Sequence, residues 1–407
     1  MNRIALFRWI VGGFVLTALP LLSASRSESG WKAEVSELLR SIQLVAKEGE
    51  GNVAASRAWR QLSQMNAAVL PRILASIDEE EPLPANWMCS LVDSIAERVL
   101  RSGAKLPQTE LEAFVKDTRQ SPRARRLAFE WLARVDASAP DRLIPAMLHD
   151  PGVDFRRDAV DRLLSAAKAH DEAKRQAEAA AIAVYNEALS GARDEDQIQQ
   201  IVTRLRDYGQ EVNLPRHFGF LMRWKVIGPF DNVEKRGFDR PFPPEQEINL
   251  DVEYDGKSGK VRWIDYTSED EYGLVDLNAG IAEEKGVVAY ALHEFVSHKE
   301  QEVELRVGTK NAWKLWVNGE LAYTRDEYHH GTKLDHYRAR SRLKKGRNQI
   351  LLKVCQNDLI ANWTKVWRFQ IRVCDSAGTA ILSQIRGGKQ ETSAVKPRAQ
   401  LELKGDE

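Results

Sequence analysis

Apolar positions follow a helical period up to about residue 213 and a strand period beyond it. Within 31–213 they recur at intervals of three and four, as at Leu91, Val92, Ile95 and Val99, which is the spacing of one buried helix face. The runs are short and end at turn signals such as Pro82. This pattern predicts a domain of short α-helices over 31–213.

Two of these helices repeat at a fixed interval. Ala128 and Leu132 recur as Ala159 and Leu163, an offset of 31 residues. A small alanine allows neighbouring helices to approach, and the leucine fills the space between layers. The stretch 150–164 resembles a HEAT-repeat helix, and the resemblance extends over about 55–165. Degenerate helical hairpins that are not HEAT repeats are the alternative.

The end of the helical part has the strongest helix propensity. Residues 168–192 are rich in alanine and have high helix propensity, and they predict one long helix that closes the array. A last helix is predicted over Gln197–Tyr208, where Gly209 ends it.

After Pro215 the apolar period becomes two, and β-forming residues dominate. Asn318-Gly319 between two apolar runs predicts a two-residue hairpin turn. The other predicted strands are 221–228, 260–265, 287–292, 302–308, 337–343, 348–356 and 366–373. Many strands without intervening helices predict an antiparallel β-sandwich or jelly roll over 216–380. The polar segment 381–407 is predicted to be a disordered tail.

Four stretches of the β region carry a family resemblance: 224–230, 314–320, 343–354 and 369–373. Their order resembles the galactose-binding-like β-sandwich over about 220–376. It is similar to the sugar-binding domain of family 2 glycoside hydrolases and to modules of secreted planctomycete-type bacterial proteins. The resemblance implies carbohydrate binding at loops on one edge, although other members of this superfamily only pack against a neighbouring domain.

Composition narrows the class of protein. The chain has 407 residues, with 59 Lys and Arg against 59 Asp and Glu. This balance argues against a nucleic-acid-binding protein, which must neutralise phosphates. Three cysteines cannot form a disulfide framework or a four-cysteine zinc site. If the runs around Cys355 and Cys374 form a hairpin, the two thiols lie too far apart to bond, so free buried thiols are expected.

The first 25 residues have the order of a secretory signal peptide. Arg3 and Arg8 precede the apolar stretch Trp9–Leu22, and small residues follow at Ser23–Ser25. The mature protein is therefore expected to begin near residue 26 and to be periplasmic or extracellular. An uncleaved signal anchor is the alternative.

No nucleophile elbow, phosphate-binding loop, dinucleotide fingerprint or His-Glu-x-x-His motif occurs in the sequence, so a non-catalytic protein is expected. A sugar-binding module would stack sugar rings on exposed aromatic side chains. Trp363 is the best candidate because 358–364 reads as a loop, although it can also cap the edge of the sandwich. Tyr328 and His330 are further ligand-binding candidates.

Arg338, Arg340 and Arg342 alternate along a predicted strand, so their guanidinium groups share one face. Such a row suits a sulfated or carboxylated polysaccharide, but it can equally pair with the acidic strand residues Glu302 and Glu304.

Metal and cofactor signals are weak. His329, His330, His336 and Asp335 match no known ligand spacing, and loop hydrogen bonding is the simpler interpretation. The galactose-binding-like resemblance implies a structural Ca²⁺, for which Asp326, Glu327 and Asp231 are candidates. No other cofactor is expected.

Two other functions remain open. The helical repeats can serve as a protein-interaction scaffold in the cell envelope, with Trp59, Trp87 and Trp131 as anchors if they are exposed. A polysaccharide-active hydrolase requires a pair of carboxylates that the sequence does not identify.

Overall fold

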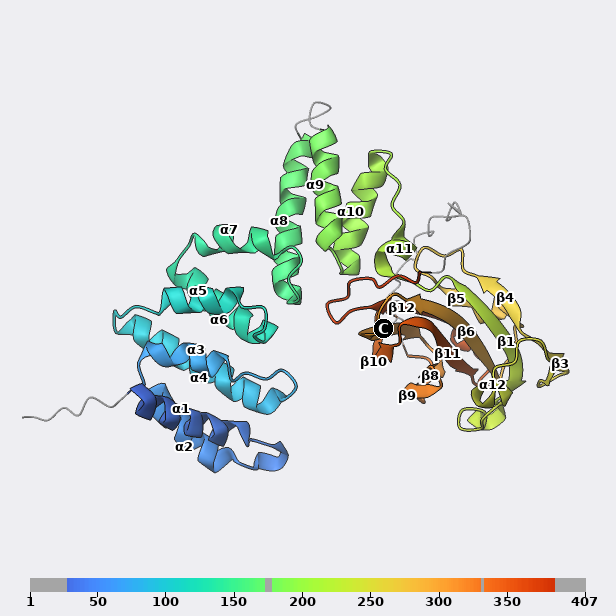
Figure 1. Cartoon of the computed structure of the whole chain (residues 1–407), viewed down its shortest axis with the longest axis horizontal. Coiled ribbons are helices and arrows are strands. Elements are labelled where there is room, and N and C mark those ends of the chain that lie inside the picture. Colours follow the sequence, from blue (N-terminus) through green and yellow to red (C-terminus); the bar gives the residue numbers. More distant parts are fainter. Residues whose placement is uncertain (1–27, 173–177, 331–332, 385–407) are drawn as a thin grey trace, which may run out of the picture. The chain divides into compact units, whose positions relative to one another are not determined.

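The computed structural model describes residues 28–172, 178–330 and 333–384, so the predicted signal segment 1–25 lies outside the described residues. The described chain consists of helices followed by antiparallel strands, as the sequence predicts (Figure 1). It divides into two compact units, Met1–Asp136 and Ala137–Glu407. No helix among the described residues is long and apolar enough to cross a membrane.

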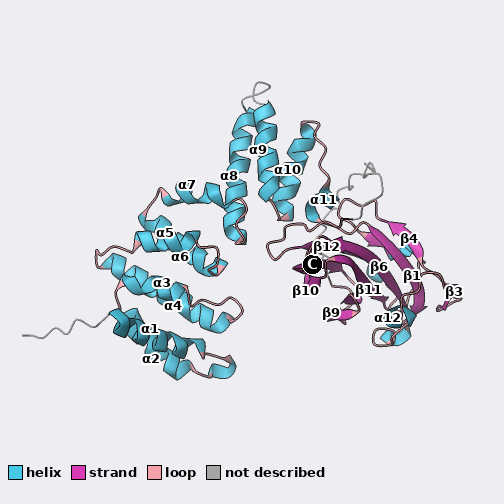
Figure 2. Ribbon diagram, in the orientation of Figure 1, coloured by secondary structure: helices cyan, strands magenta, loops and turns pink. Residues whose placement is uncertain are grey.

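The described residues of the first unit form helices and no strand (Figure 2). Its helices are α1 Glu28–Gln43, α2 Asn52–Ser63, α3 Leu70–Leu74, α4 Pro82–Arg101, α5 Gln108–Lys116 and α6 Pro122–Val135, with short 3₁₀ turns at Lys47–Gly49 and Ala67–Val69. Helix α1 packs on α2, α3 on α4, and α5 on α6. The repeat positions Ala128 and Leu132 are buried, in agreement with their predicted packing role.

Indole groups link the second helices of these pairs. Trp59 Nε1 donates to Ser90 Oγ at 3.3 Å, and Trp131 Nε1 donates to Asp93 Oδ1 at 2.8 Å. Trp131 is 4% exposed and therefore belongs to the core, so it cannot anchor a partner. Trp59 and Trp87 are half-buried.

The second unit begins with the helices α7 Ala139–Leu143, α8 Val153–Glu172, α9 Glu178–Gly191, α10 Glu195–Asp207 and α11 Leu214–Phe218, and a 3₁₀ turn at Ile144–Met147. Helix α10 confirms the last predicted helix, but the single long helix predicted over 168–192 is wrong. Helices α8 and α9 are separate and pack against each other. Leu164 and Tyr185 share one buried cluster across this pair. Helix propensity describes single residues and does not register that two helical segments pack against each other.

The strands form two main antiparallel sheets. They are β1 Arg223–Asp231, β2 Tyr254–Asp255, β3 Lys260–Val261, β4 Ile264–Thr267, β5 Val275–Asp276, β6 Val287–Ser297, β7 Gln301–Thr309, β8 Ala312–Val317, β9 Glu320–Arg325, β10 Tyr337–Leu343, β11 Gly346–Gln356 and β12 Arg368–Cys374. The six-stranded sheet has the order β4-β1-β6-β11-β8-β9, and the four-stranded sheet has the order β10-β7-β12-β5. Strands β2 and β3 pair separately. The short helical segments of this region are Val233–Lys235, α12 Pro243–Gln246, α13 Leu277–Gly280 and Asn362–Thr364.

One apolar cluster joins the two main sheets. It contains Trp313 and Leu352 from the six-stranded sheet together with Leu305 and Phe369 from the four-stranded sheet. The predicted turn between β8 and β9 is confirmed, because Asn318 and Gly319 have φ values of 55° and 84°. Strands β11 and β12 lie in different sheets, so the hairpin considered between them does not form, and Cys355 and Cys374 are free thiols.

Helices and strands share cores in the second unit. Phe220 and Tyr272 from the strand region join the buried cluster of α8 to α11. The change from helix to strand falls at α11, close to the predicted 213–216, but α7 to α11 belong to the same compact unit as the sheets.

Residues 381–384, predicted to open the tail, hydrogen-bond to the sheets. Gln384 N donates to Val296 O at 2.9 Å, and Ile381 N donates to Val373 O at 2.9 Å. Folded structure therefore extends at least to residue 384, and 385–407 lie outside the described residues.

Candidate functional site

Loops gather at one edge of the six-stranded sheet. Antiparallel order places the ends of β1, β9 and β11 and the starts of β6 and β8 at this edge. We call the segments 232–236, 284–286, 310–311, 326–330 and 357–364 the loop edge. They are joined by backbone hydrogen bonds: Asn232 N to Gly286 O (2.8 Å), Gly286 N to Asn357 O (2.9 Å) and His329 N to Lys310 O (2.5 Å).

The loop edge exposes four large apolar side chains. Ile360 is 87% exposed, Trp363 62%, Leu359 47% and Val233 40%. Val233 and Asp358 both border Gly286, so the two loops are adjacent. We call Val233, Leu359, Ile360 and Trp363 the apolar tip. An exposed apolar group of this kind is typical of a contact surface, because folding of the chain alone favours burying large apolar side chains away from water.

A buried threonine fixes the loop that carries most of the apolar tip. The Thr364 hydroxyl lies 2.7 Å from Leu359 O and 2.8 Å from Ala361 O, and it accepts from Ala361 N at 3.2 Å. Gln356 Nε2 and Lys285 Nζ both donate to Thr364 O. A loop held in this way loses little conformational entropy when it binds a ligand.

Aromatic rings from two segments meet at the loop edge. The Trp363 and His329 rings contact edge to face, with centroids 5.0 Å apart and planes at 82°. Tyr328 lies next to His329, and its hydroxyl accepts from Asn232 Nδ2 at 3.3 Å. Lys235 Nζ lies 5.1 Å from the centre of the Tyr328 ring. Trp363 therefore packs against His329 and is still 62% exposed.

The surroundings of His329 shift its imidazole towards the neutral form. Burial lowers the pKa of its imidazole, and the nearby Asn357 side chain acts in the opposite direction without reversing the shift. The geometry between the two falls short of a hydrogen bond, since His329 Nε2 and Asn357 Oδ1 are buried without a partner among the described residues. Asn357 is 5% exposed.

The structure brings together some predicted site residues and separates others. Trp363 and Tyr328 both belong to the loop edge, and Trp363 has the exposure that the sequence predicts. His330 is exposed and lies 3.4 Å from Glu327. The three arginines Arg338, Arg340 and Arg342 lie elsewhere, on β10 at the edge of the four-stranded sheet.

The sequence did not single out Leu359, Ile360 or Val233. The sequence nevertheless shows that these large apolar residues lie in loops: two lie within 358–364, and the third follows the end of β1. A loop residue of this type has no strand partner, so its exposure was predictable from its position alone.

The calcium candidates do not converge. Glu327 forms an ion pair with Arg325, and Asp231 Oδ1 accepts from Val233 N at 3.3 Å. Within the described ranges, no group of three or more His, Cys, Asp or Glu side chains is placed to hold a metal ion. The metal interpretation of His329, His330, His336 and Asp335 therefore finds no geometric support.

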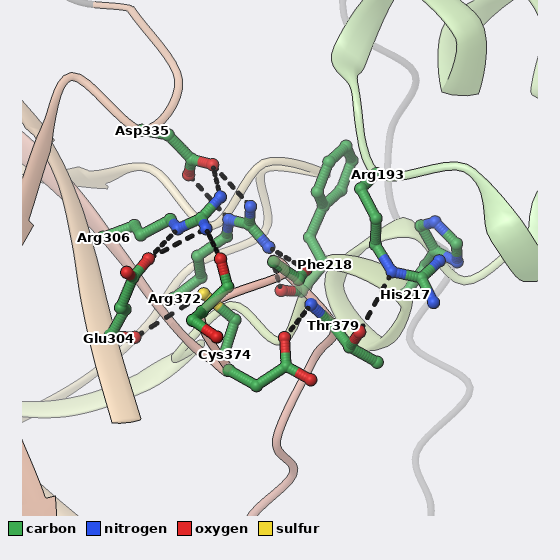
Figure 3. Close-up of polar contacts among 12 residues, drawn as sticks. Arg193, His217, Phe218, Glu304, Arg306, Asp335, Arg372, Cys374 and Thr379 are labelled. Atoms are coloured by element: carbon green, nitrogen blue, oxygen red, sulfur yellow. Dashed lines mark hydrogen bonds and ion pairs between the residues drawn. The ribbon is translucent and has the colours of Figure 1, made fainter. Parts of the chain in front are cut away.

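Asp335 instead joins a buried ionic network on the outer face of the four-stranded sheet (Figure 3). Its carboxylate accepts from Arg372 Nε at 2.6 Å and from Arg306 Nη1 at 2.8 Å. Arg306 Nε also donates to Glu304 Oε2 at 2.9 Å. Arg372 Nη1 donates to Phe218 O at 3.2 Å, so the network connects the sheet to α11.

His217 lies beside this network. Burial and the nearby Arg193 lower its pKa to about 4, and its Nε2 donates to Ala192 O at 3.1 Å. In the unfolded chain a histidine titrates near 6.5, so acidification protonates the unfolded state first. We expect the unfolding free energy to fall by about 2–3 kcal/mol between about pH 6.5 and about pH 4.

Denaturant unfolding of the wild type and His217→Gln across this range measures that dependence. His217→Gln should flatten the pH profile, whereas the same change at the exposed His298 should leave it unchanged. An unaltered profile in His217→Gln would show that another group is responsible.

A second buried charge, Lys353, fixes residues 238–245, which follow the segment 232–236 of the loop edge. Lys353 Nζ, on β11, is 0% exposed and donates to Phe238 O (2.9 Å), Arg240 O (2.9 Å) and Glu245 Oε1 (2.7 Å). The Tyr290 hydroxyl also donates to Glu245 Oε1. These contacts hold the chain around α12 against the outer face of the six-stranded sheet, where Phe242 and Tyr290 share an apolar cluster.

Comparisons with known proteins give no family. No family model matches the chain, and no curated protein matches it. Among solved structures, a β-glucosidase from Kluyveromyces marxianus is 12% identical over 38% of this chain and 16% of its own, with a TM-score of 0.24. A GH31 α-xylosidase from Xanthomonas citri is 11% identical over the same two shares, with a TM-score of 0.18. The alkylpurine DNA glycosylase AlkC from Pseudomonas fluorescens is 12% identical over 86% of this chain and 95% of its own, with a TM-score of 0.18.

The matched part thus spans only 16% of the length of the two glycosidases. TM-scores this low support no inference about fold or activity. The case for function therefore depends on the side chains of the chain itself.

Proposed function

We propose that the protein is an exported, non-catalytic recognition protein that binds carbohydrate through the loop edge. In this proposal the two main sheets form a galactose-binding-like sandwich, and the helices of the first unit are HEAT-like repeats that offer a surface to a protein partner. Residues 1–25 would be removed on export to the periplasm or the exterior. An intact mass of the exported protein that retains these residues would contradict this step.

The exposed ring of Trp363 is the observation that carries the proposal. Sugars bind proteins by placing C–H faces on aromatic rings while polar side chains orient the hydroxyl groups. Trp363 is 62% exposed, is supported by His329 and stands on a loop fixed by Thr364. Lys235, Glu234 and Asn362 are exposed polar groups of the same loop edge that can orient hydroxyls.

Trp363→Ala is expected to weaken binding of the full chain to its polysaccharide by about tenfold or more, because loss of a central aromatic contact costs about 2 kcal/mol. Affinity electrophoresis in gels containing galactomannan, xylan, dextran or polygalacturonate identifies the ligand and measures the loss. Trp363→Phe should keep part of the affinity, since it retains a ring.

Ile360→Ala is the matched control, because it truncates the most exposed apolar residue of the same loop without touching a ring. For a sugar ligand this change should have little effect. Equal affinity in the wild type and Trp363→Ala would overturn the proposal for this edge.

The exposure of Ile360 and Leu359 favours a second candidate, a protein partner that docks on the apolar tip. Aliphatic side chains contribute to protein interfaces and do little for sugar hydroxyls. In that case Ile360→Ala should reduce capture of the partner as strongly as Trp363→Ala. The ratio of the two effects therefore distinguishes the two candidates.

A further inference from the structure

The stretch 333–347 departs from the charge balance of the chain. It contains seven basic residues and one acid, Asp335, while the whole chain has 59 of each sign. Strand β10 places Arg338, Arg340 and Arg342 on the solvent side of the four-stranded sheet, where all three are exposed. Alternate residues of a strand lie about 6.6–6.8 Å apart, so the three side chains form a row along the sheet edge.

Three arginines also lie side by side across neighbouring strands. In the antiparallel register Arg338 is opposite Arg306, and Arg306 is opposite Arg372. Like charges directly opposite each other destabilise a sheet unless an anion compensates them. Asp335 and Glu304 compensate Arg306 and Arg372, which are both buried. Within the described part of the chain, neither of these two carboxylates pairs with Arg338.

Acids of β7 lie opposite the other two arginines of β10, Arg340 and Arg342. Glu302 is opposite Arg342, and Arg342 Nε lies 2.9 Å from Glu300 Oε1 and 3.7 Å from Glu302 Oε1. Glu304 is opposite Arg340 and also accepts from Arg306. The positive charge of the row is therefore concentrated towards Arg338, at the start of β10.

We propose that the outer face of β10 binds an anionic polysaccharide, with Arg338 contacting its carboxylate or sulfate groups. This inference rests on the proposed function and names the class of glycan. Guanidinium groups bind carboxylate and sulfate oxygens with two parallel hydrogen bonds, which fixes orientation as well as charge. Strand β10 lies at the edge of its sheet, so no further strand covers its free side. A linear polysaccharide that lies along β10 would therefore meet successive guanidinium groups.

A nucleic acid fits this surface less well. Proteins that bind nucleic acids surround the phosphate chain with a broad positive field, whereas this chain is neutral as a whole and the row of three exposed arginines is confined to one strand. A narrow row of positive charges along one edge strand suits a polymer whose negative charges are spaced along its repeating units.

The test uses one polymer backbone in three charge states: dextran, dextran sulfate and carboxymethyl-dextran. Binding of the full chain is measured by biolayer interferometry at about 50 mM and about 300 mM NaCl, because screening separates charge contacts from others. We expect tighter binding to both charged polymers than to dextran, with the difference reduced at high salt. Arg338→Gln should weaken binding to the charged polymers by about tenfold, the value of one charge-assisted contact.

Arg342→Gln is the matched control, since it removes the same charge from the same face but from a residue already paired with Glu300 and Glu302. It should weaken binding less than Arg338→Gln does. Arg57→Gln, at an exposed site in the first unit, controls for net charge. Equal losses in all three variants would overturn the inference, because they would show a general charge effect.

Failure of this inference can be told from failure of the proposed function. If Trp363→Ala abolishes polysaccharide binding and Arg338→Gln changes nothing, the loop edge binds glycan and the role of β10 is refuted. If Arg338→Gln weakens binding and Trp363→Ala does not, β10 binds the anionic chain and the loop edge is refuted. Equal binding of polyglutamate and dextran sulfate would overturn the assignment to a glycan.

Discussion

Asp335→Asn is expected to lower the unfolding free energy by about 3–5 kcal/mol, because it removes one partner of a buried ionic network and leaves the others uncompensated. The Arg372 side chain is 1% exposed, and that of Arg306 is 7% exposed. An asparagine keeps the shape and can accept one hydrogen bond, but it supplies no charge to either guanidinium. Chemical denaturation followed by circular dichroism measures the loss.

Asp265→Asn is the control for Asp335→Asn. Asp265 pairs with Lys225 at 2.7 Å, but its side chain is 85% exposed. A surface pair of this kind contributes about 0–1 kcal/mol, so the control should unfold almost as the wild type does. Similar losses in the two variants would refute the buried-network interpretation.

The Asp335 carboxylate also predicts that the unfolding free energy depends on pH in the acid range. Burial alone would raise the pKa of Asp335, but the hydrogen bonds and charges of Arg372 and Arg306 outweigh it and hold the pKa below its usual value of 3.8. A lowered carboxyl pKa gives stability that is present above 3.8 and is lost as the pH falls through the folded-state value. Asp335→Asn should therefore lack the part of the acid transition that lies below the window assigned to His217.

Lys353→Met is expected to cost about 3–5 kcal/mol for a related reason, since it leaves Glu245 with a buried charge and no cation. It also removes the donor to Phe238 O and Arg240 O, which hold the chain before α12 on the sheet. We expect this segment to become sensitive to proteolysis before the rest of the unit. Limited proteolysis with mass mapping, together with denaturant unfolding, measures both effects.

Two further variants test the cause. Lys353→Met combined with Glu245→Gln should recover part of the loss, because removing both charges of a buried pair costs less than removing one. Lys225→Met, at a half-exposed lysine of β1, should cost about 1 kcal/mol or less. If the double variant is less stable than the single one, the buried-charge explanation is wrong.

Local patterns in the sequence predicted the local structure well. Strand β10 covers the predicted 337–343, and the turn at Asn318-Gly319 has the positive φ values that its residue types require. The loop position of Trp363 predicted its exposure. Each of these follows from residues close together in the chain, where propensity and period carry the information.

Contacts between distant residues were not predictable in the same way. Lys353 reads as an ordinary polar position of a strand, yet it is fully buried because residues 238–245 fold over it. Asp335 was considered a metal ligand from its histidine neighbours, while its partners Arg306 and Arg372 lie on other strands. Pairing of this kind depends on sheet order, which a single sequence does not specify.

Hydrogen–deuterium exchange of the full chain, with and without a polysaccharide selected by the affinity gels, tests the central claim most directly. It reports which backbone segments a bound ligand protects. Binding at the loop edge predicts slower exchange in 357–364 and 326–330, and no such protection in Trp363→Ala. Protection confined to the helices of the first unit, with unchanged exchange in 357–364, would contradict it.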